Sequence, residues 1–292
     1  MKLLIDLYKV HSPSGHEEAM RKFIASYVSK KIKGASVVMD KLGNLFVTKG
    51  ESESYPCIVA HMDEVHTVRP KKFKVVVYKD NYLLGGNAEI LRPCGIGADD
   101  KNGIWVALRL LERFDVAKAA FFVGEETGCV GSRACDMKFF DNCRFVLQAD
   151  RKSGGDFVDE ACGVTLCDQK FKSAMKISQF GYKCTSGLST DVQALKSRGL
   201  SVACANVSCG YYNPHTIDEY TDFSELENCL EMCEYAFRHI TDVMRHKHKA
   251  KYDLPSYSGS RVYPKDWGLD DETDMGMRGG VGQDWRQWYG KK

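Results

Sequence analysis

Three short apolar runs in this sequence end abruptly in a histidine or an acidic residue. They cover residues 56–60, 119–123 and 144–149, of which the third also contains Arg144 and Gln148. His61 follows the first run, Glu125 the second and Asp150 the third. Continuous apolar runs of this length are typical of strands buried on both faces of a parallel sheet. Because helical patterns separate the runs, the sequence predicts an α/β fold with a mostly parallel central sheet and helices on both faces.

Hydrophobic periodicity predicts the elements around these runs. We expect helices over residues 15–33, 104–111, 169–178 and 191–198, and from about residue 222 onward. We expect strands over residues 36–39, 45–48, 73–78, 82–84 and 201–208. The pair 73–78 and 82–84 would form a hairpin that turns at Asp80 and Asn81. The segment from Ser14 to Glu17 has the capping-box pattern, which predicts Ser14 as the N-cap of the first long helix.

The character of the chain changes at about residue 245. A basic segment begins there, and the rest of the chain is rich in Gly, Asp, Tyr and Trp without periodicity. Trp267, Trp285 and Trp288 lie in this stretch. We therefore predict a folded domain over residues 1–244 and an extended, flexible C-terminal tail over residues 245–292.

The bulk composition excludes several classes of protein. A formal net charge of +2 with 27% charged residues gives no reason to expect a nucleic acid or an anionic membrane as a partner. No stretch approaches the roughly 20 apolar residues needed to span a bilayer, and the N-terminal apolar run breaks at Asp6, too early for a signal peptide. The 12 cysteines include no Cys-x-x-Cys pair, so we expect mostly buried, reduced thiols in a cytoplasmic protein.

Histidines and carboxylates gather just beyond the predicted strand ends, where α/β sheets bind their ligands. The candidate residues are His61, Asp63, Asp99, Glu125, Glu126, Asp150 and His215. Imidazole and carboxylate ligands suit zinc, or cobalt or manganese, and a bridging carboxylate would divide them into two metal sites. Asp63 can hydrogen-bond the far nitrogen of the His61 ring. Because neighbouring side chains on an extended chain point apart, one acid of the Glu125–Glu126 pair can bind a metal while the other takes a proton from water.

The sequence also resembles a known family, the co-catalytic di-zinc exopeptidases, whose clan contains peptidase T, glutamyl aminopeptidase and related zinc carboxypeptidases. The matching segments are residues 11–17, 60–63, 97–103, 124–128 and 214–215. They occur in the family's order and span roughly residues 1–240. Gly-Ala-Asp-Asp-Lys-x-Gly at 97–103, followed by Glu125-Glu126, is the most specific part.

The resemblance implies a role for each candidate residue. Asp99 would bridge two metal ions and would be followed by a cis peptide bond. His61 and Asp150 would complete one metal site, and Glu126 and His215 the other. Glu125 would be the general base, and Asp63 the acid behind the histidine ligand. We interpret Asp100 as a loop residue that contacts its own backbone.

The chain departs from many family members in one respect. The stretches between His61 and Asp99 and between Asp150 and His215 are too short for a lid or an inserted dimerisation domain. We therefore expect a bare catalytic domain, with the oligomeric state left open. The lid arginine that binds the substrate carboxylate in carboxypeptidases has no place here, which favours an aminopeptidase.

These observations predict a metal-dependent aminopeptidase that acts on small peptides. Asp191 is a candidate partner for the substrate amine, or alternatively an N-cap for the helix that follows it. One alternative function is a metal-dependent amidase or deacylase of N-acyl amino acids. Another, of a different class, is a catalytically retired, metal-stabilised binding protein.

Overall fold

The computed structural model describes residues 1–248, and a mixed nine-stranded sheet forms the centre of this part of the chain. The strand order is β1-β2-β7-β3-β8-β12-β9-β10, and β11 pairs with β9. The strands are β1 (Ala35–Met39), β2 (Leu45–Lys49), β3 (Tyr55–His61), β7 (Ala117–Phe122), β8 (Cys143–Arg151), β9 (Asp156–Ala161), β10 (Val164–Thr165), β11 (Lys183–Gly187) and β12 (Cys204–Ser208). The central strands β7, β3, β8 and β12 run parallel to one another, while β1 and β2 pair antiparallel at one edge. The predicted α/β fold is confirmed.

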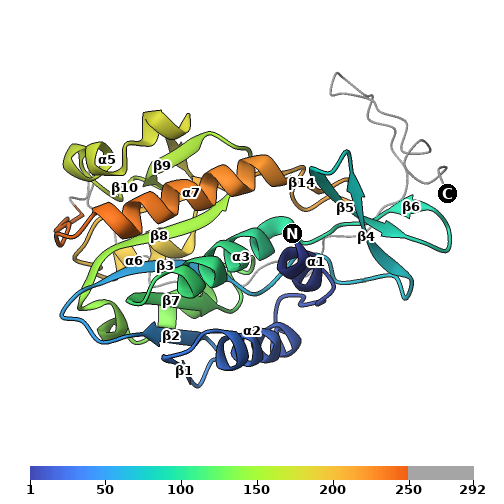
Figure 1. The fold of residues 1–292 in the computed structure, drawn as a ribbon, viewed down its shortest axis with the longest axis horizontal. Helices are drawn as coiled ribbons and strands as arrows, with labels where there is room; N and C mark the ends of the chain where they lie inside the picture. Colours follow the sequence, from blue (N-terminus) through green and yellow to red (C-terminus); the bar gives the residue numbers. More distant parts are fainter. Residues whose placement is uncertain (249–292) are drawn as a thin grey trace, which may run out of the picture. The chain divides into compact units, whose positions relative to one another are not determined.

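Helices cover both faces of this sheet. One face carries α1 (Lys2–Tyr8), α2 (Glu18–Lys31), α3 (Ala98–Arg113), α5 (Gln169–Met175) and α7 (Phe223–His239). The other face carries α4 (Val130–Ala134), the 3₁₀ turn η1 (Met137–Phe140) and α6 (Asp191–Ser197). Helices α3 and α7 lie side by side across the central strands (Figure 1).

Strand β3 shows why its residues form a central strand. All seven of its residues are buried. Ile58 and Ala60 pack into the core on the α3 side of the sheet, whereas Cys57 and Val59 pack into the core on the α6 side. This alternation is what a strand with two covered faces requires. It leaves His61, the last residue of the strand, at the carboxyl edge of the sheet.

A second, five-stranded sheet lies beside the first within the described residues. Its order is β13-β14-β5-β4, with β6 paired to β5. The strands are β4 (Phe73–Tyr78), β5 (Tyr82–Asn87), β6 (Arg92–Pro93), β13 (Tyr211–Tyr212) and β14 (Tyr220–Asp222). The predicted hairpin is confirmed as β4–β5, but the pairing of β14 with β5 was not predicted. This pairing places the 211–222 segment, which carries His215, beside β5 (Figure 1).

Two local predictions were wrong. The N-cap of α2 is Glu17 rather than Ser14, because the Ser14 hydroxyl donates to Asp63 at 2.8 Å instead of capping the helix. The helix predicted over 169–178 ends at Met175. Lys176 takes a left-handed conformation with φ 49°, and a 3₁₀ turn, η2 (Ile177–Phe180), follows. At α7 the prediction holds, since the Asp222 carboxylate caps the helix by accepting from the amide of Ser224.

The cysteines and the end of the folded domain can also be compared with the sequence predictions. All 12 cysteines are free thiols, and most are buried, as expected. Within residues 1–248, no helix is long and apolar enough to cross a membrane. Arg245 still pairs with Val202, so contacts of the folded domain continue past residue 244. The predicted tail, with its three tryptophans, lies almost wholly outside the described residues, and its boundary stays a prediction.

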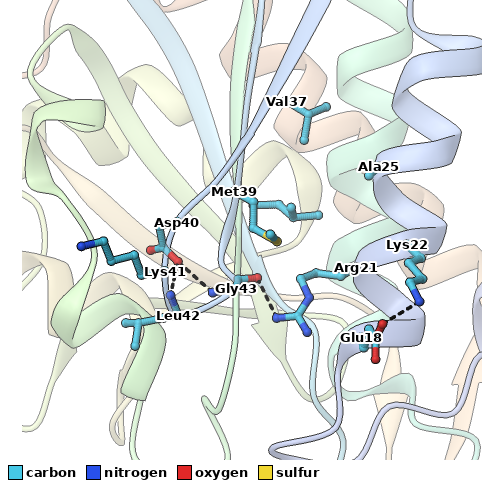
Figure 2. Close-up of a pocket in the computed structure, with 11 residues that line it drawn as sticks. Glu18, Arg21, Lys22, Ala25, Val37, Met39, Asp40, Lys41, Leu42 and Gly43 are labelled. Carbon is cyan, nitrogen blue, oxygen red and sulfur yellow. Dashed lines mark hydrogen bonds and ion pairs between the residues drawn. The ribbon is translucent and has the colours of Figure 1, made fainter.

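A groove lies between α2 and the turn that joins β1 to β2 (Figure 2). Its volume is about 580 Å³. On the α2 side Lys22 pairs with Glu18 at 2.6 Å, and Arg21 reaches across to the carbonyl oxygen of Gly43 at 3.4 Å. Met39 lies at its edge with a side chain that is largely exposed.

Candidate metal centre

The candidate site residues meet at the carboxyl edge of the central sheet. The parallel order β7-β3-β8 places the ends of these strands next to one another. His61 ends β3, Glu125 and Glu126 follow β7, and Asp150 lies near the end of β8. Asp99 lies in the first turn of α3, and His215 lies in the connection between β13 and β14. Five segments that are far apart in sequence therefore meet at one place.

Asp99 lies between the two histidines. One of its carboxylate oxygens, Oδ1, is 3.1 Å from Nε2 of His61, and the other, Oδ2, is 3.3 Å from Nε2 of His215. The His61 nitrogen is also 3.6 Å from Oδ1 of Asp150, and the His215 nitrogen is 3.0 Å from Oε1 of Glu126. The ligand atoms thus form two groups that share the Asp99 carboxylate.

These separations fit ligands around small divalent cations. Ligands about 2.0–2.1 Å from a tetrahedral zinc ion lie roughly 3.3 Å from one another. The four separations above range from 3.0 to 3.6 Å. His61, Asp99 and Glu126 also offer ligand atoms that all lie within 4.8 Å of one another. The donor set and its spacing therefore suit cations.

The buried carboxylates of the site also favour bound cations. Burial raises the pKa of Asp150 well above its usual range, and the neighbouring Asp99 raises it further. Burial likewise raises the pKa of Glu125 to about 9, with Asp150 and Asp191 adding to the shift against the opposing charge of His61. So many buried carboxylates are unfavourable together unless cations or protons offset their charge.

Asp63 contacts both His61 and the turn that carries Glu125 and Glu126. Its Oδ1 lies 3.3 Å from Nδ1 of His61, although the Asp63 backbone oxygen is closer to that nitrogen, at 3.0 Å. The Asp63 carboxylate also accepts from the backbone amides of Glu125 at 3.0 Å and Glu126 at 3.2 Å. A single buried carboxylate therefore orients a histidine and fixes the turn that carries both glutamates.

The N-terminal motif at residues 11–17 supports the same turn. The Ser14 hydroxyl donates to Asp63, and Glu17 accepts from the amide of Gly124 at 3.2 Å. This explains why the motif matters to the site although none of its residues belongs to the two ligand groups. The two glutamates differ in their contacts: Glu126 contacts His215, whereas Glu125 contacts Cys129.

Two other predicted residues are buried near the site. Both oxygens of Asp100 accept backbone amides, from Gly103 at 2.9 Å and from His61 at 3.1 Å. The peptide bond between Asp99 and Asp100 is cis, as the resemblance implies. Asp191 is fully buried and accepts from the Ser132 hydroxyl at 2.6 Å. It is the first residue of α6 rather than its N-cap, which is Thr190.

Sequence reasoning missed Glu219, which fixes the loop that carries Asp99. Its side chain is 1% exposed and accepts from the amides of Gly97 at 2.7 Å and Asp99 at 3.2 Å. His66 lies 3.0 Å from the same carboxylate. The only available signal was an acid four residues after His215, which is weak without the structure.

A buried ion cluster around Glu64 was also missed. The Glu64 carboxylate pairs with Lys101 at 2.6 Å and with Arg69 at 2.9 Å, and it accepts from the amide of Ser12 at 3.0 Å. Lys101 belongs to α3, two residues after Asp99. Gly97 lies against this cluster with φ 67°, and a Cβ there would collide with the Glu64 carboxylate. The cluster therefore fixes the start of α3.

Comparison with known proteins identifies the fold. No protein-family model matches the sequence, and no curated protein matches it. Solved structures do match. A tripeptidase from Staphylococcus aureus superimposes with a TM-score of 0.66 at 14% identity, over 82% of this chain and 97% of that chain. The aminopeptidase PepT from Bacillus cereus gives a TM-score of 0.64 at 15% identity over the same shares.

This chain has the fold of these peptidases. A third similar structure, the TET1 peptidase of Pyrococcus horikoshii, can assemble into a tetrahedron or a large octahedral shell. It gives a TM-score of 0.60 at 15% identity and covers 81% of this chain and 98% of that chain. The described domain thus corresponds to nearly the full length of each of these three chains, and the shared property is the fold.

Proposed function

We propose that this chain is a metal-dependent aminopeptidase that hydrolyses small peptides with the help of two divalent cations. The observation that carries the proposal is the Asp99 carboxylate, whose two oxygens face His61 and His215. A carboxylate in this position suits two cations better than one. The likeness to aminopeptidase and tripeptidase folds supports the same reaction class.

The residues divide between the two cations by their distances. Asp99, His61 and Asp150 would hold one, and Asp99, Glu126 and His215 the other. Zinc suits imidazole and carboxylate ligands best, with cobalt or manganese as substitutes. When bound, such cations lower the pKa of water and polarise a carbonyl group.

Asp63 and Glu125 would control the positions of protons around these ligands. A hydrogen on Nδ1 of His61 can be shared with the carboxylate and backbone oxygen of Asp63, which leaves the Nε2 lone pair for a metal. Glu125 stands beside the ligands without contacting either histidine. As general base it takes a proton from the attacking water, and as general acid it delivers that proton to the leaving amine.

Aminopeptidase action is favoured over carboxypeptidase action and over deacylation. We expect no separate lid domain, because β4, β5 and β6 lie between His61 and Asp99, and short strands with helices α5 and α6 lie between Asp150 and His215. The free thiols favour a reducing compartment, which fits a cytoplasmic peptidase that acts on small peptides.

Substrate selectivity tests the proposal. The purified, zinc-loaded chain is assayed with aminoacyl anilides, with tripeptides, and with the same peptides carrying an N-acetyl group. We expect hydrolysis only where the amine is free, with metal analysis showing two ions per chain. Faster hydrolysis of the N-acetylated compounds would assign the site to a deacylase. No hydrolysis by a chain that holds two metals would favour a retired binding protein.

A further inference from the structure

The turn after Glu126 places a cysteine beside the proposed base. Cys129 takes a left-handed conformation with φ 58°, directly before α4. Its amide donates to the backbone oxygen of Glu125 at 2.8 Å, and its thiol donates to Oε1 of the same residue at 3.5 Å. On its other side the sulfur lies 3.5 Å from the hydroxyl of Ser189. Cys129 is 1% exposed.

The Cys129 thiol is a hydrogen-bond donor to the carboxylate of the proposed base, Glu125. Among residues 1–248, the Glu125 carboxylate accepts from no other donor. In this contact the thiol is the donor and the Glu125 carboxylate is the acceptor. The Ser189 hydroxyl can then donate to the sulfur. The three groups form a short hydrogen-bonded chain that runs from the 188–190 loop to the base.

We infer that Cys129 is a positioning residue that orients Glu125 through its thiol, with Ser189 holding the thiol in turn. The inference rests on the proposed function, because it requires Glu125 to be the base. With Oε1 held by the thiol, Oε2 accepts no hydrogen bond from residues 1–248 and is the oxygen that remains for the proton of the attacking water.

The chemistry of the donor suits this task. An ionised donor such as lysine or arginine would stabilise the carboxylate strongly and make it a poorer base. A thiol is a weak, neutral donor, so it orients the carboxylate without neutralising it. The left-handed conformation of Cys129, unusual for a residue other than glycine, directs the side chain back toward Glu125.

Steady-state kinetics of variants tests the inference. Cys129→Ala removes the donor, and we expect kcat to fall about five- to tenfold while KM changes less than twofold and both metals are retained. Cys129→Ser restores a donor and should recover kcat to within about twofold of the wild type. Ser189→Ala, at an exposed position, should give a smaller loss of about twofold.

Two controls separate positioning from general packing. Cys135→Ala removes a thiol of equal burial, whose sulfur donates to the Ser132 carbonyl and not to the base; it should leave kcat unchanged. In a Glu125→Gln background, Cys129→Ala should cause no further loss of kcat, because the thiol acts only through Glu125.

Crystal structures of the variants test the orientation of Glu125 without a kinetic assay. Glu125 should adopt one conformation in the wild type and Cys129→Ser, and more than one in Cys129→Ala.

The outcomes are distinguishable. An active wild type with unchanged kcat in Cys129→Ala, or with no recovery in Cys129→Ser, would overturn the role of Cys129 and leave the proposed function in place. A further loss on adding Cys129→Ala to Glu125→Gln would do the same. A wild type that holds two metals but hydrolyses no peptide would overturn the proposed function and this inference with it.

Discussion

Two polar regions of the molecule differ in how their side chains are held. The groove beside α2 is large, at about 580 Å³, but its charged residues are loosely fixed. Lys22 and Glu18 form an ion pair whose side chains are 75% and 68% exposed (Figure 2). At the carboxyl edge of the sheet, His61 is 1% exposed and Asp63 is 2% exposed, and each has several hydrogen-bond partners.

The difference shows that a large hollow can hold its charged side chains only loosely. Exposed ion pairs contribute about 0–1 kcal/mol and rearrange readily in water. Catalysis needs polar groups that are already oriented before the reaction, because reorientation adds to the barrier. At the candidate metal centre, backbone amides and buried carboxylates supply that order. We therefore expect substitutions at the two regions to have very different effects.

The largest effect is expected at the shared ligand. Asp99→Asn keeps the shape of the side chain but replaces the carboxylate that faces both histidines. The variant should bind at most one metal ion instead of two and should lose measurable peptidase activity. Elemental analysis after dialysis against zinc measures this directly. Two tightly bound ions in the variant would show that Asp99 is not the bridge.

A nearly equal loss of rate, without loss of metal, is expected at the base. Glu125→Gln removes the proton acceptor, and a general base contributes roughly 10²- to 10⁴-fold to a rate. We expect kcat to fall by that factor while the metal content stays at two. Activity near the wild-type value would assign the proton transfer to another residue.

An intermediate effect is expected where a residue supports the ligands without joining them. Glu219→Gln weakens the acceptor that fixes the amides of Gly97 and Asp99. Changes behind metal ligands cost about 10- to 100-fold in metal affinity. Competition with a zinc chelator should reveal a loss of this size. Unchanged affinity would show that the loop keeps its position without the Glu219 carboxylate.

The smallest effect is expected in the groove. Lys22→Ala removes an exposed ion pair and should leave the unfolding midpoint of the variant equal to that of the wild type within error. Peptidase activity should match that of the wild type. A loss of activity above twofold would contradict the contrast between the two regions and would connect the groove to catalysis.

The parts of the fold that could be predicted are those with local signals. The apolar run at 56–60 forms β3, and the polar residue that ends it lies at the site, because burial on both faces leaves a clear pattern. Strands β13 and β14 contain two and three residues, too short for any periodicity, and β14 pairs with β5 far away in sequence. Glu219 could not be predicted for the same reason.

Local patterns also failed where tertiary contacts competed with them. The Ser14–Glu17 segment has every feature of a capping box, yet Ser14 donates to Asp63 and Glu17 accepts from Gly124. The Ser14 hydroxyl therefore contacts the site rather than the helix end, and the Glu17 carboxylate accepts from both Gly15 and Gly124. The thiol of Cys129 carries no sequence signal at all, since its contact with Glu125 depends on a left-handed turn.

The position of bound metal in a crystal tests the central hypothesis most directly. Anomalous diffraction from a zinc-loaded crystal should show two peaks about 3.5–4 Å apart on either side of the Asp99 carboxylate. One should lie by His61 and Asp150, the other by Glu126 and His215. A single peak, or two peaks that do not share Asp99, would contradict a two-metal site at this edge of the sheet.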